Sequence, residues 1–544
     1  MKKLIISTLI MVLTLSLASC TKLLENPREG ATEFDSFYAN ANGEDAEKLI
    51  AAVYNTYFGS VEGTGALTAL EIISDDYGCG GGSYSDNANN YRNADELTYL
   101  PSHNLFRGNT YSQIYSIIYQ SNLILDKIPE SNDATVNRVK GEATFFRAVA
   151  LFEAMRIWHD PPFADHIYTS EDMLAPNGDP KEMIDWVLEN LDNASKMLPN
   201  LPAKGQQASI GGRATSAAAL AFYGKAALWY GTQYKDNEYV KKAIAPLKKI
   251  IDSNLYGLIP NMKDLGRQKS DFCEEYIFER NAAETSLDQR RQNDNRHVWR
   301  SFQAIHVYIP TGIKGVGWAF CNPSKEFVEF MKEHDGEDNA RFNAKLLSFD
   351  QLMAMDYPDE HKGMKLDAFI PNSVGYFDYQ MIPWYEDAYP DTGNDFYSRA
   401  NVAIIRYAEV LLMYAEAKFI ADGDSDGSGL RALNQVRERA QLPAVNSLTM
   451  QVIIDERRAE LFGDCERWFD IIRWGIANEV LKDAGIHRYT FYGYKPGTTE
   501  YDIRDNWEVG KIGEGHGWDD KYWNLPYGTT HLQANPNLKQ HPGW

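Results

Sequence analysis

Long stretches in which apolar residues recur every three or four positions constrain the fold of this chain more than any other feature. In residues 110–128, Ile114, Ile117, Ile118 and Leu125 fall on one broad face of a helix. Apolar residues recur with helical spacing in seven further stretches: 137–158, 180–198, 213–231, 238–253, 401–421, 429–441 and 450–475. The pattern therefore predicts a mostly α protein.

The order of these stretches predicts one large domain over residues 41–544. Helix pairs over about 41–255 and 396–475 are typical of a tetratricopeptide-like scaffold, although no fixed repeat period is present. Between them, about 256–395, helical patterning fades and Gly, Pro, Asn, Tyr and Trp cluster, which predicts a loop-rich insertion. Residues 476–544 are expected to form an extended C-terminal segment.

The N-terminus has the features of an export signal. Lys2 and Lys3 precede an apolar run, residues 4–17, that is too short to span a membrane comfortably. The following Leu-Ala-Ser-Cys fits a bacterial lipobox, so residues 1–19 are predicted to be a signal peptide and Cys20 the lipidated first residue of the mature chain, followed by a tether to residue 40. The alternative is a secretory signal cut elsewhere, with Cys20 an ordinary residue.

Charge and cysteine content narrow the classes of function. A formal net charge of -22 argues against binding to nucleic acid or to anionic lipid. The chain has 24 Phe, 12 Trp and 32 Tyr, so some amphipathic Tyr and Trp side chains are expected at the surface. The four remaining cysteines can pair in three ways, and their wide spacing supports neither a metal site nor a disulfide framework: Cys79, Cys273, Cys321 and Cys465.

Residues 453–474 are predicted to form one dense amphipathic helix. Its charged residues are spaced for internal pairing at three positions: Asp455 with Arg458, Asp464 with Arg467, and Asp470 with Arg473. The run from residue 456 to 458, Glu-Arg-Arg, is either a binding cluster or a solvated or scaffold-pairing helix face. The second alternative is favoured, because charge runs on helices usually serve solvation or pairing.

This helix and four other segments resemble one protein family. They are IIDERRAELFGDCERWFDIIRW at 453–474, GEATFFRA at 141–148, RYAEV at 406–410 followed by YAEA at 414–417, LNQVR at 433–437, and NPNLKQ at 535–540. Taken in their order along the chain, the segments resemble the SusD/RagB family of Bacteroidetes outer-membrane nutrient-binding lipoproteins, and the resemblance runs from the lipobox to the C-terminus.

The resemblance implies a SusD-like fold, in which tetratricopeptide-like helix pairs carry a loop-rich variable face. It further implies a non-catalytic protein without a cofactor, lipid-anchored in the outer membrane and exposed at the cell surface. There it would bind a glycan, or occasionally a peptide, beside a SusC-like TonB-dependent β-barrel. The protein would act as a lid that captures oligomers and passes them to the transporter.

Aromatic residues in loops are the candidates for glycan contact, because Trp and Tyr rings stack on the apolar faces of sugars. Tyr77, Tyr84 and Tyr91 lie in the Gly- and Asn-rich segment 75–92, and Trp318 follows two glycines in Gly-Val-Gly-Trp. Three weaker candidates are expected to be core residues more often than contacts: Trp299, Trp384 and Tyr385.

The sequence has no HExxH, Walker-A or G-x-G-x-x-G motif. A surface glycoside hydrolase remains the alternative, since two facing acids leave no local signature; a purely structural surface protein is a third class. The acids at 422, 424 and 426 imitate the start of a calcium loop, but the twelfth position is Leu433 instead of an acid. An ordinary polar turn is therefore favoured there.

Overall fold

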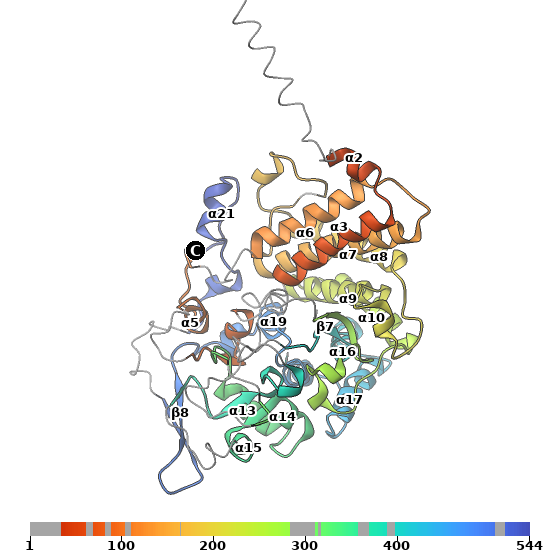
Figure 1. The fold of residues 1–544 in the computed structure, drawn as a ribbon. Helices are drawn as coiled ribbons and strands as arrows, with labels where there is room; N and C mark the ends of the chain where they lie inside the picture. The colour runs from red at the N-terminus through yellow and green to blue at the C-terminus, as the bar shows by residue number, and fades with distance from the viewer. Residues whose placement is uncertain are drawn as a thin grey trace, which may run out of the picture.

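A stack of helices forms the upper half of the molecule in the computed structural model (Figure 1). The structure describes residues 34–60, 69–81, 89–103, 110–163, 165–282, 311–313, 317–356, 369–388, 398–505 and 517–544. Consecutive helices pack against each other: α3 (Gly43–Ser60), α6 (Thr110–Lys127), α7 (Ala134–Trp158), α8 (Pro180–Met197), α9 (Ser216–Gln233) and α10 (Asn237–Ser253). The five helices predicted between residues 110 and 253 are confirmed.

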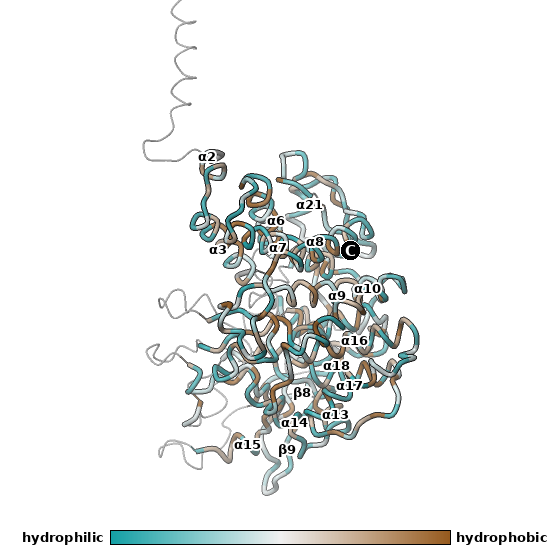
Figure 2. Tube along the Cα trace, turned by 90° about the vertical axis from the view of Figure 1, so that its right-hand side faces the viewer, coloured by the Kyte–Doolittle hydropathy of each residue, from teal (hydrophilic) through white to brown (hydrophobic). Residues whose placement is uncertain are grey.

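Local sequence signals set the ends of these helices. The side chains of Asp133, Asp179, Thr215 and Asp236 each accept a hydrogen bond from a backbone N–H in the first turn of α7, α8, α9 and α10. Helix α7 ends at Trp158, shortly before the Pro-Pro pair that the sequence predicts as its limit. Residues on all sides of α7 are buried, because it lies in the middle of the stack (Figure 2).

The chain leaves this scaffold after α10 and returns to it at α16 (Tyr407–Asp422), which packs against α10 and α17 (Ser428–Arg439). The predicted helix 401–421 begins later than expected. Residues Val402–Arg406 instead form strand β7, which pairs antiparallel with β2 (Tyr276–Arg280). Three β-branched residues lie within β7, and the neighbouring strand satisfies their backbone groups, so pairing prevails over helix formation here.

The intervening section consists of short elements instead of long helices. Antiparallel pairs join β1 (Tyr77–Gly78) to β3 (Asn322–Pro323), and β4 (Leu346–Ser348) to β6 (Tyr376–Asp378). A three-stranded sheet combines β5 (Ile370–Pro371), β8 (Tyr489–Tyr494) and β9 (Tyr501–Asp505). The short helices of this section are α13 (Lys325–His334), α14 (Ala340–Lys345) and α15 (Phe349–Met353), and those elsewhere in the chain are α2 (Phe34–Ala39), α5 (Asn89–Asp95), α20 (Ala477–Val480) and α21 (Thr529–Ala534).

The segment predicted as one helix over 453–474 is two helices, α18 (Met450–Glu460) and α19 (Arg467–Trp474). The intervening turn contains Gly463 and Cys465, whose φ angles are 88° and 62°. Such left-handed residues end an α-helix, so the prediction of a continuous helix is wrong. The turn points α19 in a new direction, and α19 packs against α9.

The charged residues of this segment pair with distant parts of the chain. Only Asp470 and Arg473 make the predicted local ion pair, at 2.8 Å. Arg458 instead binds Asp75 and Asp76, at 3.0 and 2.8 Å, and Arg467 binds Asp75 at 2.7 Å. The predicted local pairs of Asp455 with Arg458 and of Asp464 with Arg467 are therefore wrong.

The Glu-Arg-Arg run at 456–458 serves the scaffold. The side chains of Glu456 and Arg457 are 0% and 2% exposed. Glu456 binds Arg341 and Arg437 at 2.5 and 2.6 Å. The expectation of a scaffold-pairing face is confirmed for both residues, whereas the expectation of a solvated face is wrong for them.

Candidate functional site

A two-stranded ribbon built from β1 and β3 holds the exposed Trp318 in place. The ribbon pairs Tyr77 with Pro323 and Gly78 with Asn322. It stays paired at its far end, where the Gly81 N–H donates to the Ala319 carbonyl at 2.8 Å. Immediately before Cys321, the Phe320 ring is buried against Tyr91, with ring centroids 5.8 Å apart.

Trp318 itself lies at the surface. Its side chain is 44% exposed, and one edge rests on Phe320 with ring centroids 6.1 Å apart. A large ring fixed to a paired backbone loses little conformational freedom when a ligand covers it. This arrangement suits stacking against a sugar face.

The structure corrects the interpretation of Tyr77 and Tyr91. They are 2% and 0% exposed. The Tyr77 ring stacks on Phe462, with centroids 4.5 Å apart, and its hydroxyl donates to Asp378 at 2.7 Å. Rings enclosed in this way leave no face for a ligand that arrives from solvent, so both tyrosines are packing residues.

Trp384 and Tyr385 pair with residues 312 and 313, which lie shortly before Trp318 in the chain. Ile313 forms a β-bridge with Trp384, and the Tyr385 N–H donates to the Gly312 carbonyl at 2.9 Å. Five residue steps join Ile313 to Trp318, and a fully extended chain of that length would limit their Cα separation to about 18 Å. Trp384 is partly buried between Tyr379 and the Arg267 guanidinium, whereas Tyr385 is 58% exposed. Tyr385 is therefore a second exposed aromatic ring in this part of the molecule.

Two sequence candidates, Tyr84 and Trp299, lie outside the described residues, as does the lipobox Cys20.

A polar groove opens beside the other end of the ribbon. Its volume is about 600 Å³, within the range of small-molecule binding sites. Asp95, Lys325, Asn372 and Tyr489 line it, together with residues 479–485. Four residue steps along the strand, from Tyr77 to Gly81, place this groove about 13 Å along the ribbon from the Trp318 end.

The groove carries groups that could bond sugar hydroxyls. The Asn372 amide donates to Asp95 at 2.9 Å, and Arg488 binds the same carboxylate at 3.0 Å. Burial raises the pKa of Asp95 to about 6, against the opposing effect of the Arg488 charge. His487 stacks on Tyr489, with ring centroids 6.0 Å apart. Sequence reasoning missed this groove, because its residues come from six separate segments without a shared motif.

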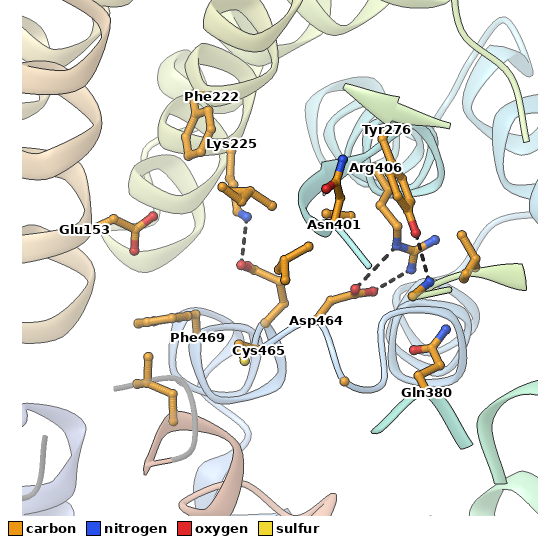
Figure 3. Close-up of a pocket in the computed structure, with 18 of the residues that line it drawn as sticks. Glu153, Phe222, Lys225, Tyr276, Gln380, Asn401, Arg406, Asp464, Cys465 and Phe469 are labelled. Carbon is orange, nitrogen blue, oxygen red and sulfur yellow. Dashed lines mark hydrogen bonds and ion pairs between the residues drawn. The ribbon is translucent and has the colours of Figure 1, made fainter. Parts of the chain in front are cut away.

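A second cavity, between α9, β7 and the turn before α19, is too small for a comparable ligand (Figure 3). Its volume of about 70 Å³ holds a few water molecules. The Lys225 ammonium binds Glu466 at 2.7 Å and Glu409 at 3.0 Å, and Arg406 binds Asp464. The charged groups around this cavity neutralise one another, which assigns them to the scaffold.

Two carboxyl groups next to this cavity, the half-buried Asp271 and the buried Glu279, predict a pH dependence of stability. Asn401 donates to Asp271 at 2.8 Å and to Glu279 at 3.0 Å. Burial raises the pKa of each carboxyl group to about 7. A carboxyl group whose folded pKa is raised stabilises the fold below its unfolded pKa, near 4.5 for Glu, and this contribution is lost as pH rises through 7.

We therefore expect Glu279→Gln to remove part of the loss of stability between pH 5 and pH 8. Both donors to Glu279 bind the same carboxylate oxygen, so a glutamine can keep these hydrogen bonds and stay neutral. In urea unfolding, the decrease in the free energy of unfolding from pH 5 to pH 8 should be smaller by about 2 kcal/mol in the variant than in the wild type. Glu238→Gln, on the exposed face of α10, is the control. An identical pH dependence in wild type and Glu279→Gln would contradict the assignment.

In the acidic turn between α16 and α17, nearby backbone N–H groups already bond the carboxylate of Asp424. Asp424 accepts hydrogen bonds from the Gly429 and Leu430 N–H groups at 2.7 and 2.8 Å, and Asp422 binds Lys418 at 2.9 Å. These contacts favour the polar turn. Within the described residues, no cluster of His, Cys, Asp or Glu is arranged to hold a metal ion.

Calcium is accordingly expected to leave the melting temperature unchanged, with or without EDTA. Asp424→Ala should destabilise the protein by about 1 kcal/mol, because the first turn of α17 loses its acceptor. Thermal melts of both proteins with calcium and with chelator measure this directly. A calcium-dependent rise in Tm that disappears in Asp424→Ala would instead establish a metal site.

The adjacent acids at 75 and 76 do not form a hydrolytic pair. Both are buried and bound by Arg458, and Asp75 is also bound by Arg467. The two arginines hold the pKa of Asp75 at about 2 despite burial, whereas burial and its neighbour raise the pKa of Asp76 to about 6. Both carboxyl groups are thus held in ion pairs in the interior, whereas glycoside hydrolysis needs two acids that face the substrate.

Comparison with known proteins identifies the family. Residues 274–544 match the family model described as the SusD family, and residues 39–228 match one described as "Starch-binding associating with outer membrane". A SusD-like protein of Formosa agariphila is 24% identical over 88% of this chain and 93% of its own length. One of Bacteroides ovatus is also 24% identical, over 79% and 78% of the two chains.

Solved structures share the fold. A laminarin-binding SusD-like protein superposes with a TM-score of 0.71 at 23% identity, covering 93% of this chain and all of its own. Surface glycan-binding protein A from Bacteroides thetaiotaomicron, in complex with laminarihexaose, gives 0.67 at 20% identity, with 92% and 99% covered. In the part of the chain that the structure describes, no helix is sufficiently long and apolar to cross a membrane. The matched family models and the shared mostly α fold place this chain in the SusD/RagB family.

Proposed function

We propose that this protein is a non-catalytic glycan-binding lipoprotein that captures oligosaccharides at the cell surface. The exposed Trp318 ring, fixed at the end of a ribbon that is anchored in the core, carries the proposal. Tyr385 is a second exposed aromatic ring in this part of the molecule, and the polar groove offers hydrogen-bonding groups further along the ribbon. Stacking would supply most of the affinity, and the polar groups the choice of sugar.

The names of similar proteins support this class of ligand. Laminarin and laminarihexaose are the glycans named for two structures with the same fold, and neither is described as an enzyme. The description of the second family model refers to starch binding and the outer membrane. A β-glucan or α-glucan is therefore the first choice of probe.

We further propose that acylated Cys20 anchors the protein in the outer membrane, with its binding face at the cell surface. The lipobox and the family description support this location. The bound glycan would then pass to a SusC-like TonB-dependent transporter, for which this protein acts as a lid. Co-purification of a β-barrel with the tagged full-length protein, from membranes solubilised in detergent, tests the partnership; a Cys20→Ala variant should remain unanchored.

Isothermal titration of the purified mature chain against a glycan panel tests the function. The panel contains laminarin, starch-derived oligosaccharides and unrelated plant glycans, with peptides as the competing class. We expect reversible binding of at least one glycan and no cleavage products by chromatography. Cleavage would establish the hydrolase alternative, binding of peptides alone would change the ligand class, and no binding at all would favour a structural surface protein.

A further inference from the structure

Two cysteines lie opposite each other in the ribbon that carries Trp318. The register pairs Tyr77 with Pro323 and Gly78 with Asn322, so the next pair is Cys79 with Cys321. The Gly81 N–H donates to the Ala319 carbonyl, which keeps the two chains together beyond the cysteines. Directly opposite residues on antiparallel strands project to the same side.

The register brings these two residues within disulfide distance. Cα atoms of directly opposite residues on antiparallel strands lie about 4.5 Å apart in a non-hydrogen-bonded pair and about 5.5 Å apart in a hydrogen-bonded pair. A disulfide spans about 4.4–6.8 Å between Cα atoms.

Both side chains are enclosed, with Cys79 3% and Cys321 1% exposed, and both are thiols in this structure. Burial raises the pKa of the Cys79 thiol, and the charges of Asp95 and Cys321 act in the same direction. A buried thiol with a raised pKa reacts slowly, because the thiolate is the nucleophile. Any bond between these sulfurs must therefore form while the ribbon is still open during folding.

We propose that Cys79 and Cys321 form a disulfide that staples the ribbon beneath Trp318. The predicted export signal places folding in a compartment where disulfides persist. The oxidant is an external disulfide of the glutathione or thiol-oxidoreductase class. The thiolate of one cysteine attacks the external disulfide, which gives a mixed disulfide and releases one thiolate of the oxidant. The thiolate of the second cysteine then attacks the protein sulfur of the mixed disulfide and releases the second thiolate of the oxidant. Two protein thiols are oxidised, the external disulfide is reduced, and the two protons pass to the released thiolates.

The bond closes the chain between residues 79 and 321 and thereby joins the first helical block to the central section. Cys273 precedes β2, and Cys465 lies in the turn before α19, so each belongs to a different part of the fold. The proposal concerns the scaffold of the site and stands whichever ligand binds.

Peptide mapping of the mature wild-type chain tests the bond. The protein is isolated without reductant after export, or refolded with oxidised glutathione, then denatured, alkylated with iodoacetamide and digested with trypsin. We expect peptide 49–92 linked to peptide 315–325, with a mass two hydrogens below the sum of the peptides, and separation on addition of dithiothreitol. Alkylation of both Cys79 and Cys321 in both preparations would overturn the proposal.

A stability measurement gives an independent result. Reduction before the melt should lower the Tm of the wild type by several degrees, because a long loop is released in the unfolded chain. Cys79→Ala with Cys321→Ala should abolish this difference, whereas the matched control Cys273→Ala should retain it. If reduction still lowers the Tm of the double variant, a bond other than Cys79–Cys321 causes the effect. If the double variant does not fold, the peptide map decides.

Discussion

Glu460→Gln is expected to lower the free energy of unfolding by about 3–5 kcal/mol, the usual cost of removing one partner from a buried ion pair. The Glu460 side chain is fully enclosed and binds Arg439 and Arg406 at 2.5 and 3.1 Å, with Arg341 at 3.5 Å. The change is nearly isosteric, so the loss reflects charge instead of packing. Three guanidinium groups then share one carboxylate fewer in the buried interior.

Urea unfolding at neutral pH measures this effect. Glu500→Gln is the matched control, because Glu500 pairs with Lys495 at 3.0 Å on the surface and should cost less than about 1 kcal/mol. The arginines lower the pKa of Glu460 to about 2. Its contribution is therefore present above the unfolded pKa near 4.5 and is lost as pH falls toward 2. Equal stability of the two variants would show that the neighbouring carboxylates compensate fully.

Trp318→Ala is expected to weaken glycan binding about 30-fold, which corresponds to about 2 kcal/mol and to the loss of a binding hot spot. The ring presents its exposed face at the end of the ribbon, so truncation removes stacking area from the proposed site. The fold should survive, because 44% of the side chain is already in contact with solvent. Titration with the best ligand of the glycan panel gives the two dissociation constants.

Tyr119→Ala provides the matched control, since Tyr119 is a comparably exposed aromatic residue (37%) on scaffold helix α6. Its binding constant should equal that of the wild type. Trp318→Phe should retain part of the affinity, because a smaller ring still stacks. If wild type binds a glycan and Trp318→Ala binds it equally well, the site lies elsewhere while the proposed function stands.

The helices of the scaffold could be predicted because their signals are local. The apolar spacing of α8 and α10 repeats over four turns, and Asp179 and Asp236 mark their first residues. The predicted starts and ends lie within three residues of those observed for the five helices of the first block. The strand Val402–Arg406 was missed, because its partner β2 lies more than a hundred residues earlier.

Site residues were harder to predict, because exposure depends on distant parts of the chain. The glycines before Trp318 correctly indicated an exposed ring. The same reasoning was wrong for Tyr77 and Tyr91, because Phe462 and Phe320, from other segments, cover them. Loop composition favours surface aromatics in general, but it does not reveal which ring another segment covers.

The sequence by itself determined the elements whose energy comes from near neighbours: the helices, their capping residues and the motifs that indicate the family. The tertiary structure alone decided which partners the charges of residues 453–474 find, where the polar groove opens, and that Cys79 faces Cys321 across 242 positions of chain. The physical reason is the separation along the chain of the residues that interact. Helix hydrogen bonds and caps join residues within four positions, whereas ion pairs, strand register and burial depend on segments that meet only after the chain has folded.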